Sequence, residues 1–249
     1  MIGILVPMPE EIELLLSEMK VTKIVTLGRR DFHLGELCGK SCVVALSRIG
    51  KVASSVTAAT MILEFGVSHV ILTGAAGAIH PNLQIGDMIV ATETIQHDLD
   101  CSPLFPRFEA PLLGISRFPC DGNLMKLALQ GFQELVVDGI PNFLSKESIA
   151  MFSLTNIRIY EGLIGSGDQF IGSKIQSEII STTIPDVLCV EMEAGAVGQV
   201  CYEYNVPYIV LRTISDLANG EAHIDFVQFV NYVVSPYTFG MVSKLLSKI

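Results

Sequence analysis

Apolar runs of strand length alternate along this chain with longer segments in which apolar residues recur at helical spacing. The short runs predict strands over Ile2–Pro7, Lys23–Leu27, Phe32–Leu37, Ser41–Leu46, His69–Gly74, Asp87–Thr94, Ile157–Ile164, Val187–Val190 and Tyr208–Thr213. The helical spacing predicts helices over Glu10–Met19, Lys51–Phe65, Leu124–Leu135, Ser173–Thr182, Glu193–Tyr204 and Asp225–Leu246, the last bent at Pro236. Such alternation is typical of a sheet covered on both faces, so the pattern predicts an α/β fold with a mixed, mostly parallel sheet.

Composition narrows the class of protein. The 249 residues, read as a single domain over 1–249, are 50% hydrophobic and 17% charged, which excludes a disordered chain or a solvated coiled coil. The net charge of −10 disfavours a nucleic-acid partner or a polybasic membrane anchor. The scattered cysteines, with no C-x-x-C pair, predict free thiols in a reducing cytoplasm. Neither a signal peptide nor a membrane span is expected, since Ile2–Met8 is too short and the uncharged run Phe65–Gly86 carries polar residues and glycines.

Ligands of such sheets bind beyond the carboxyl ends of the strands, so the residues after each strand are the first candidates for a site. Glu11 follows the first strand, either as an acid at a helix start or as a general base facing a ligand. Ala75–Ala78 follows the fifth strand, as a tight turn or as a place where backbone approaches a ligand. Phe170 and Ile171 follow a glycine turn, as core residues or as the wall of a flat ring.

The last two strands lead into acids. Glu191 and Glu193 are either helix-start acids or acceptors for vicinal hydroxyl groups. Ser215 and Asp216 either cap a turn or belong to a site. Arg212, inside the last strand, needs a carboxylate partner, for which Glu11 is a candidate.

Other chemistries lack their sequence motifs. The chain contains no P-loop, no G-x-G-x-x-G after a strand and no G-x-S-x-G. His97-Asp98-Leu99-Asp100 has the residue types of metal ligands but no further His/Cys cluster, so neither a metal nor a cofactor is expected. Carboxylates, glycine turns and apolar walls favour a flat, hydroxylated small molecule such as a nucleoside.

Seven ordered segments match a known family. They are Ile2–Glu11, Ser47–Ala53, Thr73–Ala78, Gly86–Val90, Gly162–Ile171, Val190–Ala194 and Val206–Asp216. Together they span nearly the whole chain, with Cys101–Asn156 the weakest stretch. The chain resembles the 5′-methylthioadenosine/S-adenosylhomocysteine nucleosidases of the nucleoside phosphorylase superfamily.

The resemblance implies a three-layer α/β/α sandwich of the nucleoside phosphorylase/hydrolase type, assembled as a homodimer. It implies hydrolysis of the N-glycosidic bond of 5′-methylthioadenosine, S-adenosylhomocysteine or a related 5′-substituted adenosine, without a cofactor. Asp216 would protonate purine N7, and Glu11 would activate water. The implied substrate-binding residues are Met8, Ile49, Ala76, Gly77, Phe170, Ile171, Met192, Glu193, Arg212, Ser215 and Phe226.

Some of these residues have implied roles. Glu193 would bind the ribose hydroxyls, with Met192 against the sugar. Phe170 would stack on adenine, and Ile49 and Phe226 would line the 5′-thioalkyl pocket. Arg212 would help hold Glu11 or its surroundings.

The chain departs from the family pattern at Ala75, where a serine is usual, at Pro9 and at Asn219. The loop around 99–122 is longer and richer in proline than expected, and in the family it borders the active site of the neighbouring subunit. Three alternatives stay open: a purine nucleoside phosphorylase with Arg48 as its basic candidate, an aminofutalosine-type nucleosidase, and a non-catalytic nucleoside-binding protein on the same fold.

Overall fold

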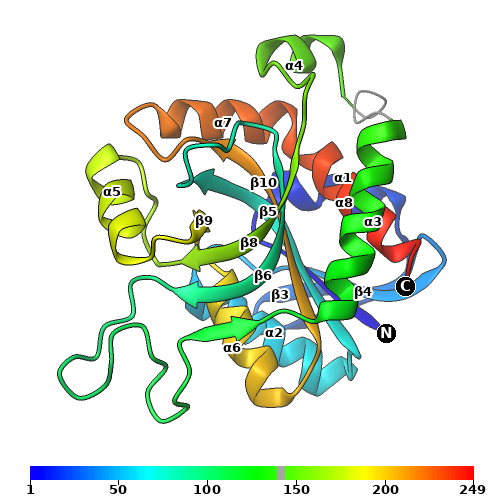
Figure 1. The fold of residues 1–249 in the computed structure, drawn as a ribbon. Coiled ribbons are helices and arrows are strands. Elements are labelled where there is room, and N and C mark those ends of the chain that lie inside the picture. The colour runs from blue at the N-terminus through cyan, green and yellow to red at the C-terminus, as the bar shows by residue number, and fades with distance from the viewer. Residues whose placement is uncertain (139–143) are drawn as a thin grey trace.

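A computed structural model describes residues 1–138 and 144–249, which form one mixed sheet flanked by helices (Figure 1). The strands are β1 (Ile2–Val6), β2 (Lys20–Leu27), β3 (Arg30–Leu37), β4 (Lys40–Leu46), β5 (His69–Ala78), β6 (Met88–Gln96), β7 (Arg117–Pro119), β8 (Ile159–Ser166), β9 (Val187–Glu191) and β10 (Tyr208–Asp216). The helices are α1 (Pro9–Glu18), α2 (Lys51–Phe65), α3 (Gly122–Asp138), α4 (Lys146–Met151), α5 (Lys174–Thr183), α6 (Ala194–Tyr204), α7 (Ala222–Tyr232) and α8 (Val234–Leu246). The α/β class predicted from the sequence is confirmed.

The sheet closes partly on itself. Its strand order is β10-β6-β8-β9-β5-β1-β4-β3-β2, and β10 also pairs with β5, so five strands form a ring. The sheet is mixed, as predicted, but parallel pairs do not predominate. Among the described residues, five strand pairs are parallel and five antiparallel. The hairpins of β2, β3 and β4 supply two of the antiparallel pairs, β10–β6 and β5–β9 within the ring supply two more, and β7 adds one against β6. The alternation of strands and helices does not reveal these pairings.

Two groups of helices pack on the sheet. Helices α2 and α6 pack against each other, and α8 packs against α1, α3 and α7 (Figure 1). Burial fits this arrangement: every residue of β1 and β10 is buried, because both strands lie inside the sheet under helices. Because β1 and β10 both pair in parallel with β5, the carboxyl ends of these three strands meet at one edge of the sheet, and this edge carries the candidate site.

The closing helix differs from the prediction. A single helix bent at Pro236 was expected, whereas α7 ends at Tyr232 and α8 begins at Val234. Pro236 thus lies in the first turn of α8, where its missing N–H removes no helical hydrogen bond. The break therefore precedes the proline instead of falling on it.

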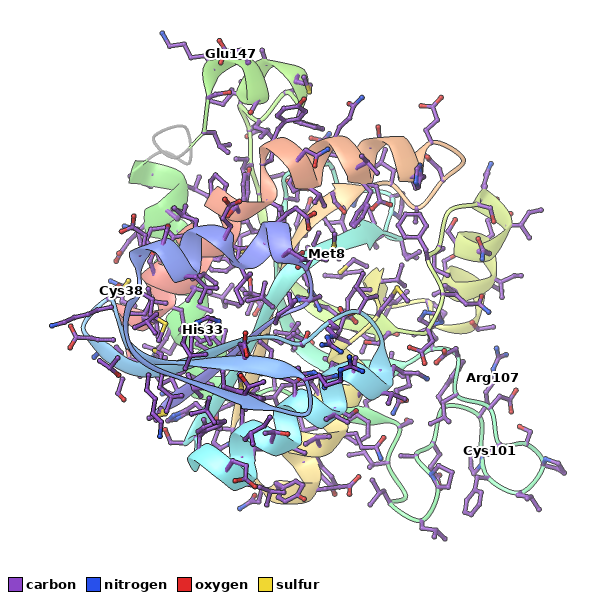
Figure 2. All side chains as sticks on the ribbon, turned by 180° about the vertical axis from the view of Figure 1, so that it is seen from behind. Met8, His33, Cys38, Cys101, Arg107 and Glu147 are labelled. Carbon is purple, nitrogen blue, oxygen red and sulfur yellow. The ribbon has the colours of Figure 1, made fainter. Side chains whose placement is uncertain are left out.

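The expected loop contains some structure. Residues 117–119 form β7 against β6, and Ala110 pairs with Ile115 in an isolated bridge. Outside these pairings the segment projects from the body of the molecule, where Figure 2 labels Cys101 and Arg107. The short helix α4 was not predicted. All the cysteines are free thiols, as expected. Within the part of the chain that is described, no helix has the length and hydrophobicity needed to cross a membrane.

Candidate active site

One pocket, with an empty volume of about 800 Å³ including its open mouth, lies at the carboxyl ends of β1, β5, β9 and β10. Its lining includes every site residue predicted from the sequence: Met8, Glu11, Ile49, Ala76, Gly77, Phe170, Ile171, Met192, Glu193, Arg212, Ser215, Asp216 and Phe226. The remaining lining residues are Pro7, Ala75, Gln169, Val190 and Glu191. Residues far apart in the sequence are thus brought to one place, although contact alone does not assign their roles.

Glu11 enters the pocket from the first turn of α1. Pro9 is the first residue of this helix and suits that position, because its fixed φ matches the helix. The Glu11 carboxylate is buried and accepts two backbone hydrogen bonds, from Met8 N–H at 3.0 Å and from Ala75 N–H at 2.8 Å. These bonds fix the carboxylate between β1 and β5. Burial raises the pKa of Glu11 to about 7, although Arg212 and the two N–H donors act in the opposite direction.

Arg212 is fully buried in β10, and its ion-pair partners correct the prediction. Instead of Glu11, its Nη2 contacts Glu191 and also lies 3.1 Å from Glu193. Glu191 and Glu193 flank Met192 just beyond β9, close enough for one guanidinium nitrogen to reach both. Sequence spacing could not choose between carboxylates at two strand ends, because that choice depends on which strands adjoin.

Arg212 still acts on Glu11 through space. An added Cβ at Gly74 would overlap Arg212 Nη1 and lie 2.9 Å from Glu11 Oε1, so the guanidinium and the carboxylate face each other across this glycine. Nη1 and Nε of Arg212 have no hydrogen-bond partner among the described residues. The cation therefore remains available to whatever occupies the space beside Glu11.

Three carboxylates surround this single cation. Besides Glu11 and Glu191, Glu193 is buried and accepts from the Gly50 N–H at 3.0 Å. Burial and the neighbouring Glu191 raise the pKa of Glu193 to about 8, against the opposing effect of Arg212. Because one guanidinium cannot neutralise three buried carboxylates, the site retains protons near neutral pH.

Asp216 is the last residue of β10 and also lines the pocket. It is buried, and it accepts from the Ser215 hydroxyl and the Ala218 N–H, each at 2.9 Å. Burial raises the pKa of Asp216, while these two hydrogen bonds lower it and Asp225 adds to the rise. An added Cβ at Gly77 would lie 2.8 Å from Asp216 Oδ1, so the backbone of β5 approaches this carboxylate closely.

Apolar side chains form the mouth of the pocket. The Phe170 and Phe226 rings meet edge to face, with centroids 5.6 Å apart and an angle of 65° between the rings. Phe170 is 43% exposed and Ile49 is 52% exposed, whereas Ile171 is buried. A flat ring that enters the pocket would therefore cover apolar surface that is otherwise in contact with water.

Glu191 lines the pocket but is not among the site residues predicted from the sequence. Its carboxylate accepts from the N–H groups of Glu193 and Ala194 and from the Ser166 hydroxyl, and it pairs with Arg212. It thus holds the turn that presents Met192 and Glu193. An acid directly after a buried strand, two residues before another acid, was the available signal.

The His97-Asp98-Leu99-Asp100 motif does not gather metal ligands. Over residues 1–138 and 144–249, no group of three or more His, Cys, Asp or Glu side chains is arranged to hold a metal ion. Asp98 instead pairs with Lys51 at 2.6 Å. His97 is buried, and its Nε2 has no partner among the described residues.

We expect Arg212→Met to destabilise the protein by about 3–5 kcal/mol, because it leaves three buried carboxylates without their cation. Denaturant unfolding at pH 8 and pH 5 checks this, with the larger loss expected at pH 8, where more of these carboxylates are charged. Stability equal to the wild type at pH 8 would mean that the carboxylates do not depend on Arg212.

The chain is similar to proteins of one superfamily. A family model described as the phosphorylase superfamily matches residues 1–247. A 5′-methylthioadenosine/S-adenosylhomocysteine nucleosidase of Aeromonas salmonicida is 34% identical over 248 residues, covering 100% of this chain and 99% of the relative. The crystal structure of the Neisseria meningitidis nucleosidase with methylthio-immucillin-A has a TM-score of 0.86 and 32% identity, over 100% of this chain and 99% of the other. The futalosine hydrolase of Helicobacter pylori has a TM-score of 0.82 and 35% identity, over 100% and 97%.

Proposed function

Because this chain belongs to the phosphorylase superfamily, among the 5′-methylthioadenosine/S-adenosylhomocysteine nucleosidases, we propose that it hydrolyses the N-glycosidic bond of these nucleosides and releases adenine. The resemblance drawn from the sequence motifs is thereby confirmed at the level of the family. One observation supports hydrolysis by acid and base catalysis: two buried carboxylates with raised pKa values, Glu11 and Asp216, line one pocket. The roles of individual residues are part of the proposal.

Glycosidic cleavage needs a proton for the leaving base and an activated water for the sugar carbon. We assign the proton to Asp216, which donates it to purine N7, since burial favours its protonated form. We assign the water to Glu11, whose carboxylate accepts its proton. The Arg212 guanidinium across Gly74 favours the ionised form of Glu11, which is the form that can accept this proton.

Other lining residues suit the parts of a nucleoside. Glu193 accepts from the ribose hydroxyls, and Met192 packs on the sugar. Phe170 stacks on adenine, next to the backbone of Ile171. Ile49 and Phe226 face the 5′-substituent. Met8, Ala76, Gly77 and Ser215 complete the walls of the pocket.

The lining favours hydrolysis over phosphorolysis. Arg212 is the only Lys, Arg or His among the described residues of the pocket, and two carboxylates already pair with it. Arg48, the basic candidate from the sequence, lines a different hollow with Arg29 and Arg30. A phosphate dianion would therefore be repelled, because Glu11, Glu191 and Glu193 outnumber the single guanidinium beside it.

We propose that the helix groups form the outer layers of a three-layer α/β/α sandwich, and that the protein is a homodimer. The projecting loop supports the dimer, because Leu104 is 83% and Leu112 is 89% exposed there. A second copy of the protein packed on this loop would remove these apolar side chains from water. It would also bring the loop near the active site of that copy. The free thiols suit the cytoplasm, which we propose as the location.

Release of free adenine from purified protein tests the proposal. We expect adenine from 5′-methylthioadenosine and S-adenosylhomocysteine at rates that do not depend on phosphate. The similarity to the futalosine hydrolase makes a 5′-substituted aminofutalosine-type nucleoside a second candidate, to be assayed in parallel. If adenine is bound but none of these nucleosides is cleaved, the protein is a nucleoside-binding protein and the proposal fails.

A further inference from the structure

Three polar residues tie three segments together beside the pocket. Lys51 Nζ lies 2.6 Å from Asp98 Oδ1, and Asp98 Oδ2 accepts from the Asp168 N–H at 2.8 Å. Asp168 in turn bonds to Lys51, since its Oδ1 accepts from the Lys51 N–H at 2.8 Å, so the three residues form a ring of interactions. These three residues, here called the latch, join the start of α2, the end of β6 and the turn after β8.

Two of the three segments of the latch lead to a residue that lines the pocket. Phe170 lies two residues after Asp168, and Ile49 lies two residues before Lys51. Gly50, next to Lys51, donates its N–H to Glu193 Oε1 at 3.0 Å. Since Phe170 and Ile49 are about half exposed, burial alone does not hold them, and their positions depend on the backbone that carries them.

The surrounding backbone is shaped for this close approach. Gly50 has φ +99°, and an added Cβ would lie 3.1 Å from Asp168 Oδ1. An added Cβ at Gly167 would lie 2.5 Å from the His97 ring. The His97 N–H also donates to the Ser166 carbonyl at 2.9 Å, so the backbone next to Asp98 is bonded to the end of β8 as well.

We propose that Asp98 is a positioning residue for the nucleoside site: through Lys51 and Asp168 it holds Phe170 against the base and Gly50 against the ribose-binding Glu193. The inference rests on the proposed function, because that function assigns Phe170 and Glu193 to the nucleoside. Asp98 touches neither the substrate nor the reacting atoms. Its effect is therefore on binding, which requires Phe170 and Glu193 equally in the ground state and the transition state.

Substitution of Asp98 separates positioning from chemistry. We expect Asp98→Ala to raise both the KM for 5′-methylthioadenosine and the Kd for adenine about tenfold, with kcat changed less than about threefold. Asp98→Asn keeps an oxygen for the Asp168 N–H and loses the charge opposite Lys51, so we expect an intermediate KM. Glu178→Gln is the matched control, because Glu178 also pairs with a lysine, Lys174, but is exposed on α5. This control is expected to leave KM and Kd unchanged.

A double variant tests whether the latch acts as one unit. Lys51→Met alone should raise KM as Asp98→Ala does, and the two together should raise it no further than the larger single effect. Wild-type KM and adenine Kd in either single variant, a loss of kcat alone, or multiplying effects in the double variant would overturn the inference. If the wild type itself neither binds nor releases adenine, it is the proposed function that fails.

Discussion

Asp216→Asn is expected to lower kcat for adenine release by about 10²–10⁴-fold, the usual value of a positioned general acid. Asparagine keeps the shape of the side chain and an oxygen for the Ala218 N–H, but it has no acidic proton to give to N7. Steady-state release of adenine from 5′-methylthioadenosine measures the loss. Adenine binding should persist, because the walls of the pocket are unchanged.

The dependence of the rate on pH should also identify Asp216 as the general acid. A general acid works while protonated, so the wild-type rate should fall as the pH rises through the raised pKa of Asp216. This alkaline limb should be missing from the residual activity of Asp216→Asn. An Asp216→Asn enzyme with the rate and the alkaline limb of the wild type would remove Asp216 from the mechanism.

Glu11→Gln is expected to lower kcat by a similar factor, about 10²–10⁴-fold, because glutamine cannot accept a proton from water. Glu11 works as a base only when ionised, and its pKa is raised to about 7. The wild-type kcat/KM should therefore rise with pH through about 7, and Glu11→Gln should lose this acidic limb. Retention of the limb in Glu11→Gln would assign it to another group, such as Glu193.

The same substitution should make the protein more stable at alkaline pH. The pKa of Glu11 is about 7 in the fold, above its ordinary value of 4.5, so folding favours the protonated carboxyl. This contribution to stability is complete below pH 4.5 and is lost as the pH rises through about 7. Glutamine carries no charge, but its amide nitrogen cannot accept one of the two backbone N–H bonds. Glu11→Gln should therefore unfold at a higher temperature than the wild type at pH 8, where it removes a buried charge, and at a lower one at pH 5, where only the lost hydrogen bond counts. A lower Tm at pH 8 would show that ionised Glu11 stabilises the fold through Arg212.

The site could be predicted from the sequence better than the packing around it. Glu11, Glu193 and Asp216 each stand at a strand end, and the ends of neighbouring strands in such sheets converge. The pairing of Arg212 with Glu191 and Glu193 could not be predicted, because it depends on strand order. The sheet order and the closure of β10 on β5 result from contacts between distant segments, which local hydrophobic patterns do not record.

Local hydrophobic patterns were also least informative in segments of small residues and in segments without a regular spacing of apolar residues. The small residues Ala75–Ala78 left a tight turn or a close backbone approach to a ligand open, whereas β5 continues through them because β10 and β9 pair with it there. The short strand β7 has no alternating pattern of its own and forms by pairing with β6. Asp98, considered from the sequence as a metal ligand, bonds to Lys51 and Asp168 because three separate segments meet beside the pocket.

Hydrolysis in water enriched in ¹⁸O tests the central claim most directly. If Glu11 activates water against the sugar carbon, methylthioribose formed from 5′-methylthioadenosine should carry one ¹⁸O atom at C1, and phosphate should change neither rate nor product. Rapid mass analysis is needed, because the free sugar exchanges this oxygen slowly through its open form. A sugar 1-phosphate that forms only with phosphate present, without ¹⁸O, would contradict the account.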